Sequence, residues 1–138
     1  MATHVGELGL SNLLATMNPS LHPDIFVFLT TKQSLEKVIP KLRPKMVFEE
    51  TEGYTIITSQ DLADSHSFEY TFTCRMITLN VHSNLEAVGF MAAVSAKLTE
   101  YNISSNVVSG YFHDHLFIAV GKEDKALEVL HNLSIEGK

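Results

Sequence analysis

Apolar positions recur at two periods along this chain, and the change from one period to the other predicts its secondary structure. Near the N-terminus, Leu10, Leu13, Leu14 and Met17 share one face of a helix with 3.6 residues per turn. Asn18-Pro19 should end this helix, because the residue before a proline is disfavoured in the α conformation. We therefore expect a short N-terminal helix.

The first half then reads as strand, helix, strand, strand, short helix, strand. A turn at His22-Pro23-Asp24 is expected before the first strand, and Pro40 should make the following helix short or kinked. The predicted elements are strands at 25–29, 45–50 and 54–59 with a turn at Glu52-Gly53, a short helix at 60–66, and a β-prone stretch over 68–82.

The second half repeats this order of elements. A bend near Cys74-Arg75 is expected to divide the 68–82 stretch into two strands. Ser83 and Glu86 match a capping box, and the helix behind it should turn Val88 toward the core. A hairpin of strands at 104–111 and 115–120 and a helix over 123–133 complete the prediction.

This repeated order predicts an α+β fold of two packed ferredoxin-like (βαββαβ) subdomains with antiparallel sheets. The first subdomain covers 1–74, including the N-terminal helix, and the second covers 75–138. The second half lacks its closing strand, and an open sheet edge invites aggregation. The strand at 25–31 and a partner chain are both candidates to cover that edge.

Composition narrows the class of protein. The 138 residues are 45% hydrophobic and 19% charged, which is typical of a globular chain, and the net charge of −6 argues against a general nucleic-acid binder. The longest purely apolar runs have five residues and the start has no basic segment, so we expect a cytoplasmic protein with no membrane span. A single cysteine, Cys74, excludes an internal disulfide.

Half of the basic residues lie in one short stretch. Residues 32–45 carry five basic side chains and one acid, Glu36, which gives +4 locally and leaves −10 elsewhere. No interleaved aromatic residues are present to stack nucleic-acid bases, so a solvated helix face is favoured over a nucleic-acid patch.

The segment from Gly89 to Ile103 resembles the ACT-domain pattern. In that pattern a strand is followed by a glycine and two hydrophobic residues at the start of a helix, and Asn102-Ile103 stands where the next strand should open. The longer runs 75–89 and 106–117 are similar to small stand-alone bacterial ACT-like proteins of uncharacterised function.

This resemblance implies two ACT-like subdomains that bind a small molecule, most often an amino acid, and regulate another protein. Family members commonly hold the ligand at an interface between modules, in the loop between the first strand and the first helix. Glu86-Ala87-Val88 departs from the Asp and Pro that often precede the glycine. No enzyme domain is evident in the sequence, so we expect action in trans and a homo-oligomer, without enzymatic activity of its own.

The loop before Gly89 is the first candidate site. A capped helix start with a glycine offers amide donors and close approach, which suits a ligand carboxylate. The alternative is a well-capped helix whose glycine only allows packing near the sheet. The candidate ligand-binding residues are Ser83, Leu85, Glu86, Ala87, Val88, Gly89, Asn106, His113, Asp114 and His115.

Three histidines form a second candidate. His113 and His115 should share one side of an extended segment, and with His82 they could supply three metal-binding nitrogens. The alternatives are a polar hairpin tip, or groups that line a pocket and titrate near neutral pH. We therefore expect no metal and no cofactor, and a small metal-dependent enzyme stays the competing hypothesis, beside a structural module without a ligand.

Classical catalytic motifs do not occur in the sequence. Cys74 beside Arg75 could have a lowered pKa, but a core or strand cysteine is the favoured interpretation, because no second cysteine or acid–base pair is near in sequence.

Overall fold

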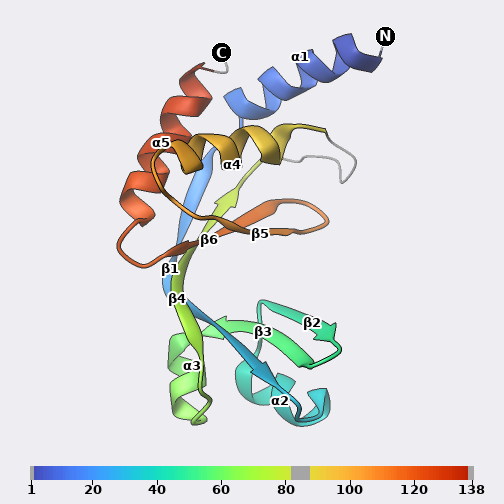
Figure 1. The fold of residues 1–138 in the computed structure, drawn as a ribbon, viewed down its shortest axis with the longest axis vertical. Helices are drawn as coiled ribbons and strands as arrows, with labels where there is room; N and C mark the ends of the chain where they lie inside the picture. The colour runs from blue at the N-terminus through green and yellow to red at the C-terminus, as the bar shows by residue number, and fades with distance from the viewer. Residues whose placement is uncertain (1, 82–87, 137–138) are drawn as a thin grey trace. The chain divides into compact units, whose positions relative to one another are not determined.

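The computed structural model describes residues 2–81 and 88–136, which form five helices and six strands (Figure 1). In chain order they are α1 (Ala2–Ala15), β1 (Pro19–Thr31), α2 (Leu35–Leu42), β2 (Met46–Glu50), β3 (Gly53–Ser59), α3 (Gln60–Ser65), β4 (Thr71–Leu79), α4 (Phe90–Glu100), β5 (Asn106–Ser109), β6 (Asp114–Ala119) and α5 (Glu123–Glu136). None of the helices within these ranges is long and apolar enough to cross a membrane.

The chain divides into two compact units that share two strands. Unit 1 comprises Met1–His22 and Met76–Lys138, and unit 2 comprises Pro23–Arg75. The strand order is β2-β3-β1-β4-β6-β5, so β1 and β4 each contribute one part to unit 1 and another part to unit 2. The two-subdomain α+β fold predicted from the sequence is confirmed. The predicted division after residue 74 differs from these units in where it places the first 22 residues.

Unit 2 has the βαββαβ order that the sequence predicts. Its antiparallel register pairs Leu29 of β1 with Ile56 of β3, and Ile56 in turn faces Val47 of β2. These residues form the side of the sheet that packs against α2 and α3, through Val38 and Ala63 among others. The short α2 contains Pro40 within its eight residues, as expected.

Unit 1 takes its closing strand from the beginning of β1. The side-chain amide of Asn80, directly after β4, donates to the carbonyl of Asn18 and to the hydroxyl of Ser20, both at 2.9 Å, and its backbone N–H donates to the carbonyl of Met17 at 2.7 Å. β1 and β4 are neighbours in the sheet. The segment that closes this sheet is therefore 19–22. It belongs to the same strand as the candidate segment 25–31 but lies before it, and the sequence predicted a turn between the two.

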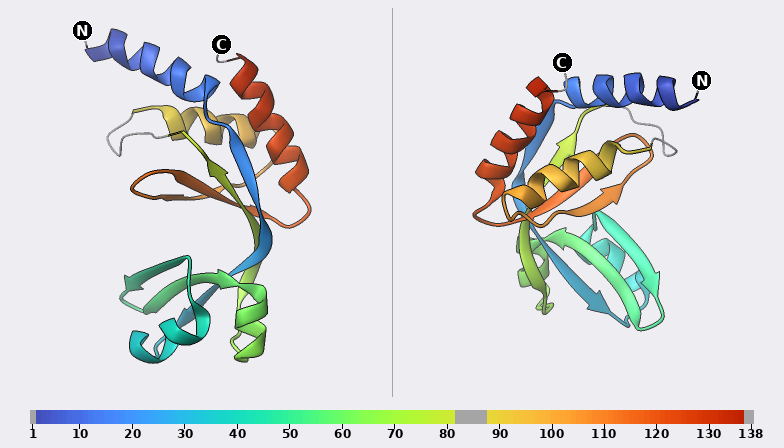
Figure 2. Two further views of the ribbon diagram at one scale, coloured as in Figure 1. Left: turned by 180° about the vertical axis from the view of Figure 1, so that it is seen from behind. Right: turned by 45° about the horizontal axis from the view of Figure 1, so that its top comes forward.

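Helices α1, α4 and α5 pack on one another in unit 1 (Figure 2). Leu10, Leu13 and Leu14 contact the buried core of this unit, and Met17 is fully buried within it, as the helical spacing predicts. The hydroxyl of Ser134 in α5 also donates to the carbonyl of Ala15 at the end of α1, at 3.0 Å. The N-terminal helix is thus part of the core of unit 1.

Two predicted interruptions are wrong. The turn at His22-Pro23-Asp24 is extended strand, because proline and the residue before it both tolerate the β region. The bend at Cys74-Arg75 is absent, because 71–79 contains neither glycine nor proline and continues as the single strand β4. Both errors fall where a strand passes from one unit to the other.

Candidate functional site

The first candidate site begins where α4 begins. This helix starts at Phe90, so Gly89 occupies the N-cap position in place of the predicted Ser83. Ser83, Leu85, Glu86 and Ala87, together with His82, lie outside the described residues. The sequence places Val88 toward the core, and this is wrong: its side chain is 88% exposed. Phe90, two residues later, is buried instead and anchors the helix start.

Gly89 is held in a conformation that favours glycine. Its φ is +88°, and among the described residues a Cβ built there would meet only Leu10 Cδ2 at 3.8 Å, which is an ordinary contact. The backbone angle therefore favours glycine at this position. Its carbonyl accepts the first helical hydrogen bond from the Ala93 amide at 2.9 Å.

The hairpin between β5 and β6 reaches the end of β4, where the candidate loop starts. Nδ1 of His113 lies 3.4 Å from the carbonyl oxygen of Val81, and Nδ1 of His115 lies 2.9 Å from the hydroxyl of Thr78. Asp114 between them is buried. The structure thus brings the predicted residues of the hairpin beside the beginning of the loop.

Asn106 is not part of this cluster. It faces Phe117 in the register, whereas Ser109 faces Asp114 at the hairpin end, so Asn106 lies three strand residues away, about 10 Å. Its side chain is exposed, on a strand that ends the sheet order.

Sequence reasoning missed Gly110 and the aromatic tip of the hairpin. A Cβ at Gly110 would lie 3.0 Å from the His113 carbonyl oxygen and 3.4 Å from His115 Nε2, so the histidine ring packs against this glycine. Tyr111 and Phe112 follow with exposed, edge-to-face rings 4.9 Å apart. The Gly-Tyr-Phe triplet before the histidines was an available signal for a tight tip.

The histidine metal site of the competing hypothesis combines His113 and His115 with His82, which lies outside the described residues. Within residues 2–81 and 88–136, no group of three His, Cys, Asp or Glu side chains is arranged to hold a metal ion. His115 contacts the hydroxyl of Thr78 in β4, and His113 contacts the carbonyl oxygen of Val81, two residues after the end of β4.

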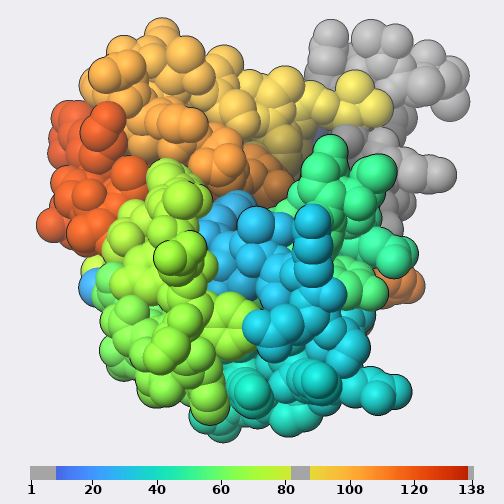
Figure 3. Space-filling view, turned by 60° about the horizontal axis from the view of Figure 1, so that its bottom comes forward, coloured from blue at the N-terminus to red at the C-terminus, as the bar shows by residue number. Residues whose placement is uncertain are grey.

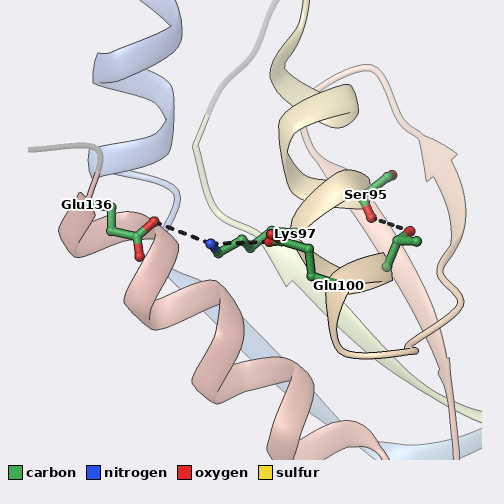
Figure 4. A network of polar contacts seen from close by, with 5 residues as sticks. Ser95, Lys97, Glu100 and Glu136 are labelled. Atoms are coloured by element: carbon green, nitrogen blue, oxygen red, sulfur yellow. Dashed lines mark hydrogen bonds and ion pairs between the residues drawn. The ribbon is translucent and has the colours of Figure 1, made fainter.

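Polar contacts gather at the far end of α4, and one of them, between Lys97 and Glu136, joins it to α5. Nζ of Lys97 lies 3.2 Å from Glu100 and 3.8 Å from Glu136, and Thr99 donates to the Ser95 carbonyl at 2.7 Å (Figure 4). The hydrogen bond to Glu100 raises the pKa of Lys97. These groups lie two helical turns from Gly89, so they belong to helix packing and not to the candidate site.

Cys74 is a core residue of unit 2. Its side chain is fully buried, its Sγ lies 3.4 Å from the carbonyl oxygen of Phe26, and burial raises the pKa of the thiol to about 12. This confirms the strand-cysteine interpretation and excludes an activated thiolate.

We expect Cys74 to resist alkylation. At about pH 8 the raised pKa leaves a thiolate fraction of about one in ten thousand, and burial blocks access as well. Iodoacetamide followed by mass spectrometry should label the unfolded protein in guanidinium chloride completely while the native protein stays unmodified. Rapid labelling of the native chain would contradict a buried thiol.

Unit 2 has an open pocket of about 800 Å³ that the sequence did not indicate. In the space-filling view, residues of β1 (blue) lie recessed between those before β4 (yellow-green) and those of β3 (green) (Figure 3). Its lining is Phe28, Leu29, Thr30, Thr55, Glu69, Tyr70 and Thr71. These residues come from three chain segments distant in sequence, which is why no local motif reveals them.

The basic residues of 32–45 lie on the surface of unit 2. Lys32, Lys37, Lys41, Arg43 and Lys45 are all exposed. Lys45 places its Nζ 6.0 Å from the ring centre of Phe26. This agrees with the predicted solvated face.

Comparison with known protein families decides what kind of module these units are. Two ACT-domain profiles match the sequence, one over residues 5–75 and one over residues 71–132. This chain belongs to the ACT-domain family. The resemblance seen in Gly89 to Ile103 is thereby confirmed for both halves of the protein.

Solved structures show the same ACT-domain fold. A Vibrio cholerae protein of unknown function is 39% identical, with 93% of this chain and 95% of that chain covered and a TM-score of 0.81. The ligand-free regulatory subunit of aspartate kinase from Thermus thermophilus is 11% identical and has a TM-score of 0.66. The match covers 86% of this chain and 97% of that subunit. The corresponding subunit from Thermus flavus is 9% identical and has a TM-score of 0.63. The match covers 86% of this chain and 98% of that subunit. A search of the curated proteins found no match.

Proposed function

We propose that this ACT-domain protein is a cytoplasmic regulatory module that binds an amino acid or a related carboxylate. Ligand binding would shift its own assembly into a homo-oligomer, or its affinity for a partner in trans, because any ligand that prefers one state stabilises that state. The module has no catalytic role in this proposal.

Membership of both halves in the ACT-domain family is the observation that carries the proposal. Two aspartate kinase regulatory subunits, which are 9% and 11% identical to this chain, have the same fold, and this shared fold supports a regulatory role. The exposed Val88 and the glycine at the start of α4 support a ligand site there, because among the described residues only the side chain of Leu10, at 3.8 Å, lies within 4 Å of a Cβ built at Gly89.

Each candidate residue has a proposed role. The ligand carboxylate would lie on backbone amides of the loop that contains Ser83, Leu85, Ala87 and Val88, with Gly89 permitting close approach, and Glu86 would accept the ammonium group. His113, Asp114 and His115 would supply polar contacts from the hairpin. Asn106 lies about 10 Å from the hairpin end along its strand, so its contact would require a longer ligand.

A thermal-shift panel of the twenty amino acids and related carboxylates tests the proposal. A ligand at about 100 times its Kd should stabilise the native protein by about 2.7 kcal/mol, because it binds the folded state alone. The melting temperature should rise with at least one member of the panel. If no compound raises it, the ligand-free structural module replaces this proposal.

A pair of glycine variants assigns such a response to the loop. Gly89→Ala and Gly121→Ala both place a side chain at positive φ, +88° and +100°, without a steric clash, so each should lose about 1–2 kcal/mol of stability. Only Gly89→Ala should also lose the ligand-induced shift. Equal ligand responses in the two variants would place the site elsewhere.

The competing metal-dependent enzyme is distinguished by metal analysis. The purified protein should contain no stoichiometric zinc, iron or manganese if His82, His113 and His115 serve a regulatory module. One equivalent of metal that is lost in His113→Ala would favour the enzyme.

A further inference from the structure

Part of the lining of the unit 2 pocket lies on the side of the sheet that faces away from α2 and α3. Val27 and Leu29 of β1 belong to the helix-facing core. Because strand side chains alternate, Phe28 and Thr30 project from the opposite side. Thr55 pairs directly with Thr30 across the β1–β3 register and therefore shares that side. Leu29 and Tyr70, which also line the pocket, belong to the helix-facing core, so the pocket lies where this outer side of the sheet meets the core of unit 2.

An aromatic pair supports the pocket. The ring of Phe28, which lines it, packs edge-to-face on Phe72 of β4 with centroids 5.5 Å apart and an interplanar angle of 70°. The pocket volume of about 800 Å³ falls within the range of about 300–1,000 Å³ that is typical of small-molecule sites. The apolar surface of Phe28 can contact a ring-sized apolar body, and the volume leaves room for it.

Two polar groups at the pocket accept hydrogen bonds. The hydroxyl of Thr55 donates its hydrogen to the carboxylate of Glu50, so this hydroxyl can only accept from a ligand. Glu69, also at the pocket, carries a carboxylate, which accepts and does not donate. Thr30 and Thr71 also line the pocket with hydroxyls that can donate or accept, so the carboxylate of Glu69 is the group that favours a cationic ligand over an anion.

We propose that this pocket binds a small molecule with an ammonium group on an apolar, ring-sized body. The body would lie against Phe28, and Glu69 and Thr55 would accept the ammonium hydrogens. This site goes beyond the proposed function, because it lies in the other unit from Gly89 and prefers a ligand without a carboxylate.

The test compares two probes of similar shape and opposite charge on the full chain. In ¹H–¹⁵N NMR titrations, 2-phenylethylamine should shift the amides of Thr30, Thr55 and Thr71, and 3-phenylpropanoate should not. Glu69→Gln should raise the Kd of the amine by about fivefold, as loss of an exposed ion pair does. Glu36→Gln, an exposed carboxylate in the first turn of α2, is the matched control and should leave the Kd unchanged.

Thr55→Val keeps the side-chain shape and removes the acceptor oxygen, so it should also weaken amine binding. Gly89→Ala should leave the amine Kd unchanged, which separates this site from the proposed amino-acid site. Equal binding of both probes, shifts confined to residues of unit 1, or no shift at millimolar amine would each overturn the proposal. A positive amino-acid panel with a negative amine titration would leave the proposed function standing alone.

Discussion

Replacing Phe90 with alanine should lower the free energy of unfolding by about 3–5 kcal/mol. Phe90 is 2% exposed at the first position of α4, within the core cluster of unit 1 that contains Val94 and Leu98. The variant loses the transfer free energy of the ring and leaves a cavity that the neighbouring helices can fill only in part. Chemical denaturation monitored by circular dichroism measures the difference.

Val88→Ala is the matched control for this prediction. Val88 lies two residues earlier and is 88% exposed, so its truncation should change the free energy of unfolding by no more than about 0.5 kcal/mol. Comparable losses in the two variants would mean that the start of α4 is not anchored by Phe90, and would contradict the burial described above.

A fragment of residues 76–138 should not fold by itself. It lacks the strand segment 19–22 and also Met17, which is fully buried in the core of unit 1. The end of β4 would then lose the hydrogen bonds that join Asn80 to Met17, Asn18 and Ser20. The circular dichroism spectrum of the fragment should be that of a largely unfolded chain.

A permuted fragment provides the control. Residues 76–136 followed by a flexible linker and residues 2–22 contain all of unit 1 that the structure describes. The linker must run from the end of α5, which contacts the end of α1, to the start of α1 at Ala2. A linker of about 15 glycine and serine residues spans about 20 Å, which is about the length of α1. This fragment should fold and melt cooperatively. Cooperative melting of 76–138 alone would instead support the division after residue 74.

The helices, strands and family were predictable from the sequence because their signals are local. The spacing of Leu10, Leu13 and Leu14 and the hairpin near Glu52-Gly53 depend only on near neighbours, and both are confirmed, with the two-residue loop one position earlier, at Thr51-Glu52. The long strands β1 and β4 were not predictable in full. Pro23 is a common turn residue, and only pairing with distant segments keeps it extended.

The candidate site was predictable in part for the same reason. His113 and His115 lie at the end of β4 as the hairpin implies, whereas Val88 was placed in the core because its spacing was extended through Gly89. The positive φ of that glycine ends the helical period. The pocket of unit 2 was missed because Thr30, Thr55 and Glu69 meet only in the folded sheet.

The shared strand β1 also sets an order of events during synthesis. Unit 2 is an unbroken segment, so all its residues have left the ribosome once 75 has emerged, whereas 1–22 must wait for partners that extend to Leu133 in α5. At about 5–20 residues per second, that wait lasts on the order of 5–20 seconds. Throughout it, Leu10, Leu13 and Leu14 lack their partners, so the nascent N-terminus is a predicted binding segment for chaperones.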